Sequence, residues 1–268
     1  MSEMVLRQYE KEPRNFIWKI ITALICVFLI VWSSSTVSLE GISQNGLQIA
    51  KNIFLGIFAP DTELLFDFVG GVPYLLLETM CIAFLGTLVG SVLAIPISFI
   101  SATNIVPKPI SVVGRFIIMS IRTVPSIVYA LMFIRVTGPG AFAGLLTMSL
   151  ASIGMISKMY IESIEDLDTK ILESLDACGC NFFQKIRYGI LPQLFPDFIS
   201  TVIYRFDMNL RDASILGIVG AGGIGAPLIF SMNSYRWNEV GAIIIGLIVL
   251  VLIIEFISTK IRVKLARG

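Results

Sequence analysis

The sequence predicts an all-α protein that crosses a membrane about six times, and three observations support this fold class. The 268 residues are 56% hydrophobic and have a mean hydropathy of +0.86. Only 15% of them are charged, whereas soluble domains usually have about 25% charged residues. Apolar runs long enough for a helix to cross about 30 Å of hydrocarbon recur along the chain. A chain with so little charge could not cover a water-facing surface, so a polytopic membrane protein is expected.

Six apolar segments are the predicted transmembrane helices, and each approaches the roughly 20 residues that a spanning helix needs. The fifth is the least regular, because Arg205, Asp207, Arg211 and Asp212 interrupt it. In chain order the segments are Phe16–Trp32, Val72–Ile100, Val112–Ile134, Ala141–Tyr160, Phe195–Gly217 and Val240–Ile257.

The chain before the second span divides into two predicted parts. Residues 1–15 are expected to be a cytoplasmic segment, and residues 16–70 to hold an uncleaved first transmembrane helix and an extracytoplasmic amphipathic segment. The amphipathic pattern of the second segment fits a helix on the outer membrane surface, and it fits equally a helix packed against the other spans. The apolar residues at helical spacing that define it are Leu47, Ala50, Ile53, Phe54 and Ile57.

The placement of lysine and arginine predicts the orientation. With six spans, four basic groups fall on one side of the membrane, and the other side holds only Lys51, Arg135 and Arg236. Basic residues favour the cytoplasmic side, so both termini are expected in the cytoplasm. The four groups are Arg7, Lys11, Arg14 and Lys19; Lys108 and Arg115; Lys158, Lys170, Lys185 and Arg187; and Lys260, Arg262, Lys264 and Arg267.

A glycine-rich stretch, "ILGIVGAGGIGAPL" at residues 215–228, contains the spacing G-x-G-x-x-G. In dinucleotide-binding enzymes this spacing cradles a pyrophosphate, and an acid about 20 residues further on, here Glu239, holds the ribose. Such a site also needs a second parallel strand, but here a membrane span follows. The sequence therefore favours a tightly packed extracellular turn at the end of the fifth span. The glycines of this predicted turn are Gly220, Gly222, Gly223 and Gly225.

Few residues suit catalysis or metal binding, so we expect no catalytic site, no metal site and no cofactor bound by this chain. The sequence has no histidine, which removes the usual acid–base group and a common metal ligand. Its four cysteines are predicted to be free thiols. A membrane-embedded enzyme would need a catalytic constellation near one face, and the acids of residues 162–176 fit a solvated helical face instead.

The segment between the fourth and fifth spans contains "ESLDACGCNFFQKIRYGILP", from Glu173 to Pro192. It predicts a short helix, a glycine stop at Gly179, a second helix, and a proline before the next span. Phe182 and Phe183 form, with Ile186, an apolar edge on the second helix. A cytoplasmic loop gains little by exposing two phenylalanines unless they pack on the bundle or on a partner.

At these residues the chain resembles the permeases of bacterial ABC importers, whose cytoplasmic coupling motif is E-A-A-x₃-G-x₉-I-x-L-P. The matching residues are Glu173, Gly179, Leu191 and Pro192. The departing residues are Ser174 and Leu175, in place of the two alanines, and Gly189, in place of the isoleucine. The plan of helix, glycine, helix and proline is retained.

A narrower resemblance covers most of the chain after about residue 70. The stretches "LLLETMCIAFLGTLVGSVLAIPISFISATN", "RTVPSIVYALMF", "GPGAFAGLL", "IGMISKMYIESIED" and "RDASILGIVGAGGIGAPL" look like those of phosphonate permeases. Methionine-type permeases share the glycine-rich turn, so an importer of another small solute is the first alternative. An ion-coupled carrier that works without ATP is the second.

The resemblance implies a type I ABC importer fold in residues 71–268, with a coupling loop at residues 162–192. It also implies a bacterial inner (plasma) membrane location and three kinds of partner: cytoplasmic ATPase subunits, a second permease copy or paralogue, and an extracytoplasmic binding protein. The chain has no G-x-x-x-x-G-K-[ST] loop, so ATP would be hydrolysed by the partner. The residues that would couple to the ATPase are Glu173, Gly179, Phe182, Phe183, Leu191 and Pro192.

Three intramembrane arginines, Arg122, Arg205 and Arg211, are the candidates for attracting an anionic substrate. Such residues are costly in a membrane unless they are paired or face water. The alternative is that they only hold the bundle together. Arg122 has no acid within four residues, which makes it the freest candidate, unless it pairs across helices with Asp207 or Asp212.

Overall fold

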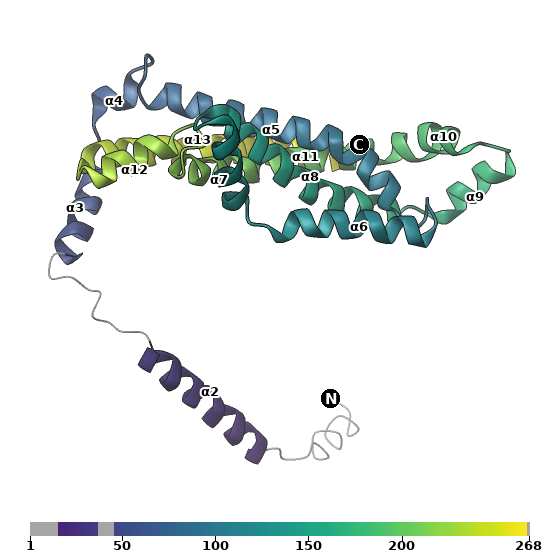
Figure 1. The fold of residues 1–268 in the computed structure, drawn as a ribbon, viewed down its shortest axis with the longest axis horizontal. Coiled ribbons are helices and arrows are strands. Elements are labelled where there is room, and N and C mark those ends of the chain that lie inside the picture. The colour runs from purple at the N-terminus through teal and green to yellow at the C-terminus, as the bar shows by residue number, and fades with distance from the viewer. Residues whose placement is uncertain (1–15, 37–45, 267–268) are drawn as a thin grey trace, which may run out of the picture. The chain divides into compact units, whose positions relative to one another are not determined.

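The computed structural model describes residues 16–36 and 46–266, and every regular element there is a helix, as predicted (Figure 1). The chain forms two compact units, Met1–Lys51 and Asn52–Gly268. The elements are α2 (Phe16–Thr36), α3 (Gly46–Phe58), α4 (Thr62–Phe66), α5 (Val72–Ser101), α6 (Lys108–Thr123), α7 (Ser126–Thr137), α8 (Ala141–Glu165), α9 (Thr169–Ala177), α10 (Phe182–Gln184), the π-helix η2 (Lys185–Ile190), α11 (Leu191–Ile218), α12 (Gly225–Asn233) and α13 (Trp237–Ala266).

The helices that could span a membrane follow the six predicted segments. Among the described residues, α2, α5, α8 and α13 are long and apolar enough to cross, and the bent pair α6–α7 brings this to as many as five. The remaining predicted span, the fifth in chain order, is α11, whose 28 residues reach about 42 Å at 1.5 Å per residue. Because α11 contains charged residues, among them Arg205 and Asp207, its hydropathy is too low for it to be counted among the apolar helices. It therefore spans only if those charges are paired or face water.

The third predicted span, Val112–Ile134, is a bent pair of helices, α6 and α7, which together are apolar enough for one span. The chain bends by 83° between α6 and α7, where Val124 adopts an extended conformation before Pro125. A proline disfavours the helical conformation of the preceding residue and has no N–H to donate. The carbonyl of Ile121, which that N–H would have reached, instead accepts a hydrogen bond from the Tyr129 hydroxyl at 3.0 Å.

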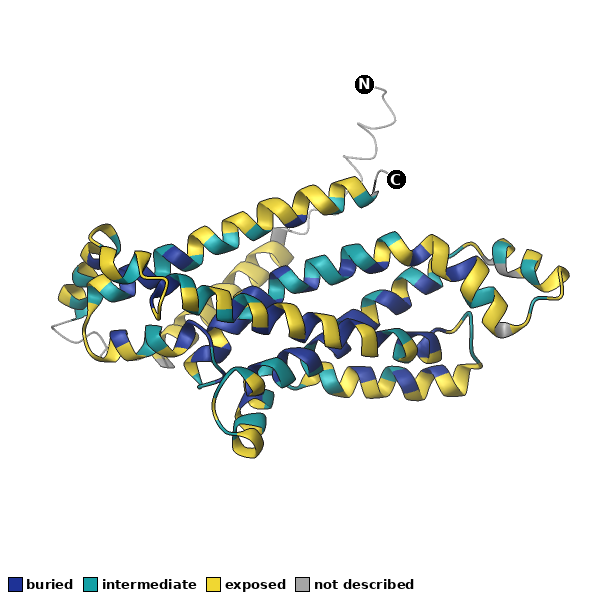
Figure 2. Ribbon diagram, turned by 90° about the horizontal axis from the view of Figure 1, so that it is seen from above, coloured by how far each residue is buried: buried dark blue, intermediate teal, exposed yellow. Residues whose placement is uncertain are grey.

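Small residues bring α5 and α8 into close contact at the centre of the second unit, where Figure 2 shows the buried positions concentrated. A Cβ added at Gly90 would lie 2.5 Å from the Cβ of Ser152, and one added at Gly86 would overlap the Cβ of Met148. Membrane helices lack a hydrophobic driving force between them, so they associate through this kind of close backbone packing.

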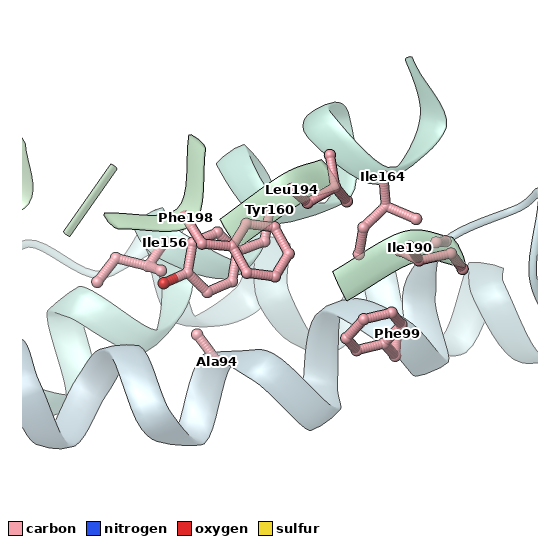
Figure 3. Close-up of a cluster of buried hydrophobic side chains, with 9 residues drawn as sticks. Ala94, Phe99, Ile156, Tyr160, Ile164, Ile190, Leu194 and Phe198 are labelled. Atoms are coloured by element: carbon pink, nitrogen blue, oxygen red, sulfur yellow. The ribbon is translucent and has the colours of Figure 1, made fainter. Parts of the chain in front are cut away.

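A second core cluster lies towards the C-terminal ends of α5 and α8 and the beginning of α11 (Figure 3). The rings of Tyr160 and Phe198 stack with their centroids 4.0 Å apart. Ile164, near the end of α8, and Ile190, just before α11, are both fully buried in this cluster. The two ends of the predicted coupling loop are therefore anchored in the core.

The end of the predicted amphipathic segment packs against the beginning of α13 within the second unit. A Cβ on Gly56 would overlap the backbone of Trp237, and one on Gly241 would overlap the backbone of Gly56. Of the two alternatives for this segment, the structure supports packing against another span for the part of α3 that follows Lys51.

Candidate functional site: the coupling segment and the intramembrane charges

The coupling segment, residues 162–192, begins with the end of α8 and continues into the short helix α9. Asp168 caps α9 by accepting a hydrogen bond from the Lys170 amide at 3.0 Å. The helix ends at Ala177, and Gly179, two residues later, has a φ of +74°. The Cys180 amide then donates to the carbonyl of Leu175 at 3.0 Å, and the Gly179 amide to that of Asp176 at 2.9 Å. This is a Schellman motif, and its left-handed residue explains why glycine stands here.

A capping box starts the second helix of the segment. The amide of Gln184 donates to Asn181 Oδ1 at 3.0 Å, and the amide of Asn181 donates to Gln184 Oε1 at 2.8 Å. These bonds satisfy two backbone donors that the first turn would otherwise leave unpaired. The path of the chain after Gly179 is thus set by local hydrogen bonds.

The second helix differs from the prediction in how it meets the next span. It was expected to end at the proline, but the chain remains helical from Phe182 through α10 and η2 into α11. The Leu191 amide donates to the Ile186 carbonyl, five residues back, so this turn is widened. Pro192 follows directly; its ring would clash with the carbonyl four residues earlier in a regular α-helix, and a wider turn relieves that clash.

The two helices of the coupling segment pack on each other through residues that depart from the family motif. A Cβ on Gly189 would overlap Cδ1 of Leu175. Leu175 is larger than the alanine that the motif has at this position. Gly189, which is smaller than the motif's isoleucine, leaves room for it. An ion pair between Lys185 and Asp176 joins the same two helices.

Most of the predicted coupling residues are exposed at one end of the bundle, where α9 and α10 lie (Figure 1). The side chain of Phe183 is 77% exposed, and that of Leu191 is 37% exposed. Glu173, Gly179 and Pro192 are also exposed. The side chain of Phe182 lies outside the described residues. Ile186, the third member of the predicted apolar edge, packs against the core cluster of Figure 3.

Arg205 is buried between α11 and α8, with 6% of its surface exposed. Its Nη2 lies 3.9 Å from a carboxylate oxygen of Asp212, and its Nε donates to Ser152 Oγ at 3.4 Å. Asn209, which sequence analysis missed, joins the same cluster by donating to Ser152 and to Thr87, both at 2.7 Å. Because it is enclosed in this way, Arg205 fits the bundle-holding role.

Arg211 is half-exposed and lies between two carboxylates. Its Nη2 is 2.7 Å from Asp207, the pair that their spacing of four residues predicted, and 3.5 Å from Glu255 of α13. Glu255 was missed as a site residue, although a single acid inside an apolar span was the available signal. Both Arg211 and Glu255 are about half-exposed in this chain. If α11 spans the membrane, these charges cannot face lipid at low cost, and this face would need water or a partner chain beside it.

Arg122, in the last turn of α6, is exposed and makes no hydrogen bond or ion pair within the described part of the chain. The expected alternative pairing with Asp207 or Asp212 is not formed, because Arg211 holds the first and Arg205 the second. The three arginines therefore do not form one site. The Arg122 stem lies against Gly154 of α8, whereas Arg205 contacts Ser152.

The glycine-rich turn lies between α11 and α12 and packs on the beginnings of α5 and α8. Gly220, Gly222 and Gly223 have φ values of +93°, +81° and +74°. The Gly220 carbonyl accepts from the Gly140 amide at 2.9 Å, and the Ile224 amide donates to Thr79 Oγ1 at 2.9 Å. Gly222 approaches Ala141, and Gly225 approaches the carbonyl of Ser214, too closely for a side chain at either glycine. The glycines serve close packing in this turn.

The described residues contain no group of three or more cysteine or acidic side chains that could hold a metal ion. The four cysteines, at positions 26, 81, 178 and 180, are free thiols.

Comparison with known proteins places the chain in a family. Residues 94–267 match the family model described as the binding-protein-dependent transport system inner membrane component. A phosphite transport system permease protein of Stutzerimonas stutzeri is 32% identical over 188 residues, which are 70% of this chain and 68% of that protein. A putative phosphite transport system permease protein of the same organism is 29% identical over 98% of this chain and 91% of the relative.

The fold agrees with this assignment. The permease chain in the inward-facing crystal structure of a methionine ABC transporter superposes with a TM-score of 0.63 at 20% identity, covering 72% of this chain and 95% of that one. At that identity the likeness supports the fold alone. Together, the family match and the relatives show that this chain belongs to the binding-protein-dependent transport system inner membrane components and is the permease subunit of an ABC importer.

Proposed function

We propose that this permease imports a phosphorus oxyanion, a phosphonate or phosphite, at the expense of ATP hydrolysed by a partner subunit. The observation that carries the proposal is the similarity to two permeases named for phosphite transport, over 70% and 98% of this chain. The five phosphonate-permease stretches found in the sequence support the same substrate class. Methionine, the solute of the structural neighbour, is the alternative, but that neighbour is only 20% identical.

The part of the coupling segment from α9 to Pro192 is the proposed docking site for a cytoplasmic ATPase. It projects from one end of the bundle, exposes Phe183, and is held to the core at both ends by Ile164 and Ile190. A rigid, exposed helix pair can transmit a rigid-body movement from an ATPase to the spans. Glu173, Gly179, Phe182, Leu191 and Pro192 belong to this proposed interface.

The proposed orientation puts the coupling segment and both termini in the cytoplasm, and the glycine-rich turn outside. The basic residues support it, because Lys170, Lys185 and Arg187 lie on the coupling segment and Lys260 and Lys264 lie near the end of α13. On the outer side, an extracytoplasmic binding protein would deliver the substrate, and a second permease copy or paralogue would complete the path.

Among the arginines, Arg122 and Arg211 are the proposed contacts for the anion, and Arg205 is assigned to holding the bundle. Arg122 is exposed without a partner in the described chain, and Arg211 is half-exposed beside Asp207 and Glu255. A guanidinium that faces the path offers an oxyanion paired hydrogen bonds and opposite charge.

Uptake by cells that express the permease with its ATPase and binding protein tests the substrate class. We expect accumulation of labelled methylphosphonate or phosphite that an excess of either oxyanion reduces and an excess of methionine does not. Accumulation that methionine abolishes would instead support the methionine-type importer. Uptake that persists with an inactive ATPase, and collapses when the ion gradient is dissipated, would support the ion-coupled carrier.

A further inference from the structure

Three side chains join the α5–α6 corner to the end of α8, and we call them the α8 clasp: Thr103, Arg115 and Glu165. A single carboxylate oxygen, Glu165 Oε1, accepts hydrogen bonds from the Thr103 amide at 2.6 Å, from the Thr103 hydroxyl, and from Arg115 Nη2 at 2.5 Å. Next to it, the Asn104 side chain donates to the carbonyl of Ile164 at 2.7 Å. The corner is therefore fastened to α8 by both backbone and side-chain bonds.

Arg115 extends this connection to the last residue of α5. Its Nε donates to the Ser101 carbonyl at 3.2 Å and to Ser111 Oγ at 3.3 Å, and Ser111 donates to the same carbonyl at 2.6 Å. A Cβ on Gly114 would overlap the Ser101 hydroxyl, so α6 also lies directly against the end of α5. One arginine thus joins α5, α6 and α8.

The clasp lies between the coupling helix α9 and the bent pair α6–α7. Glu165 is the last residue of α8, and only Asp166, Leu167 and Asp168 separate it from the coupling helix α9. On the other side of the clasp, Arg115 lies in α6, which ends at the 83° bend into α7. A short, hydrogen-bonded route therefore connects α9 to the bent pair.

We propose that Glu165 and Arg115 are positioning residues that transmit movement of the ATPase-docked coupling segment to the bent pair α6–α7. This proposal rests on the proposed ATPase partner. An isolated exposed ion pair contributes little, but the Glu165 side chain is only 25% exposed and one of its oxygens has three donors. Charge-assisted hydrogen bonds of this kind are stronger than neutral ones and fix the geometry of their partners.

The test compares Glu165→Gln and Arg115→Gln with a control on the same helix, Glu162→Gln. The glutamine at 165 keeps an oxygen that accepts from Thr103 but loses the charge that holds Arg115. Glu162 forms an exposed pair with Lys158 at 3.2 Å, within α8 alone, so the same substitution there leaves the connection between helices intact. Arg115→Lys keeps the charge but loses the bond from Nε to Ser101, and should retain more function than Arg115→Gln.

In proteoliposomes with the ATPase and the binding protein, we expect Glu165→Gln and Arg115→Gln to copurify with the ATPase and to hydrolyse ATP at the basal rate. The methylphosphonate imported per ATP hydrolysed should fall about tenfold, as expected for losing a hydrogen bond to a charged group. The control should keep the wild-type ratio. The stimulation of ATP hydrolysis by the binding protein should fall in the same two variants, a readout that does not depend on which solute is transported.

A wild-type ratio and wild-type stimulation in both clasp variants would overturn the proposal. A proportional loss of uptake, hydrolysis and copurification would also overturn it, because the clasp would then only hold the bundle together. If the wild-type protein responds to the binding protein but imports no phosphorus oxyanion, the proposed substrate fails while the ATPase readout still tests the clasp.

Discussion

Single residues explain how this chain can depart from the coupling motif and still form its helix pair. Leu175 and Gly189 exchange large and small side chains relative to the family pattern, and the structure places them against each other. Gly179 has a left-handed conformation that closes α9. Among the arginines, enclosure separates Arg205 from Arg122 and Arg211, whereas the sequence singles out only Arg122, which has no acid within four residues.

Replacing Gly189 by isoleucine should disrupt the coupling segment, because its Cβ alone would overlap Leu175. Overpacking of this kind usually costs about 1–3 kcal/mol, so we expect at least a several-fold weaker retention of the ATPase. The double variant Leu175→Ala/Gly189→Ile, which has the motif's own residues at both positions, should recover retention. Copurification with the ATPase measures both, and a double variant no better than the single one would refute the compensation.

Replacing each of the three arginines by glutamine should affect the KM of uptake and the assembly of the permease to different degrees. Arg122→Gln should assemble with the ATPase and import methylphosphonate at a raised KM, because it removes a cation that we propose faces the path. Arg211→Gln should also raise the KM, but it should assemble less well, because it leaves the buried carboxylate of Asp207 without its partner. Arg205→Gln should lower the amount of assembled permease instead, since it leaves Asp212 and Ser152 without their buried partner. Wild-type uptake in both of the first two variants would show that neither arginine serves the anion.

At the scale of elements, two helix irregularities differ in how the backbone accommodates a proline, which cannot donate the usual helical hydrogen bond. The chain bends at Pro125, where Tyr129 satisfies the freed carbonyl of Ile121. At Pro192 the chain stays helical through a widened turn. Both prolines are visible in the sequence, but it does not distinguish a bend from a widened turn, because the difference depends on side chains that come close only in the folded protein.

Removing the Tyr129 hydroxyl, which donates to the Ile121 carbonyl, should destabilise the bend between α6 and α7. Tyr129→Phe leaves the Ile121 carbonyl without its donor while keeping the ring, which should cost about 1–3 kcal/mol. We expect a lower thermal unfolding temperature for the purified permease. Tyr204→Phe on α11 is the matched control, because the Tyr204 hydroxyl makes no such bond to a helix break in the described part of the chain. Equal unfolding temperatures for the two variants would contradict this account of the bend.

Replacing Gly179 by aspartate should separate ATP hydrolysis from transport. A side chain in the left-handed conformation costs about 1 kcal/mol, and the change would also reorient the α10 helix that follows. The permease should reach the membrane, but import per ATP should fall or the ATPase should be released. Normal transport with normal stimulation of ATP hydrolysis in this variant would refute the prediction.

For the whole molecule, much of the plan could be predicted from the sequence. Hydropathy and segment length predicted the all-α fold and the helical segments, and the residues around Gly179 predicted the helix, glycine and second helix between the fourth and fifth spans. The α8 clasp could not be found in this way, because Thr103 and Glu165 are 62 positions apart in the chain. The role of Arg205 likewise depends on packing between helices, which no local pattern encodes.

The orientation is testable with cysteine labelling in a background that lacks the four native cysteines. A cysteine at Ser174, on the coupling segment, should react with a membrane-impermeant maleimide only after the membrane is opened. A cysteine at Val136, which is 82% exposed near the end of α7, should react in intact cells. The reverse pattern would invert the proposed topology.

The central claim is that this permease couples ATP hydrolysis by a partner to import of a phosphorus oxyanion. The most direct measurement is accumulation of labelled methylphosphonate or phosphite by proteoliposomes that contain the permease, its ATPase and its binding protein. The account predicts accumulation with ATP on the side of the coupling segment, none with a non-hydrolysable analogue, and a large loss with Gly179→Asp. Accumulation that is independent of ATP, or ATP-driven import of methionine but of neither oxyanion, would contradict it.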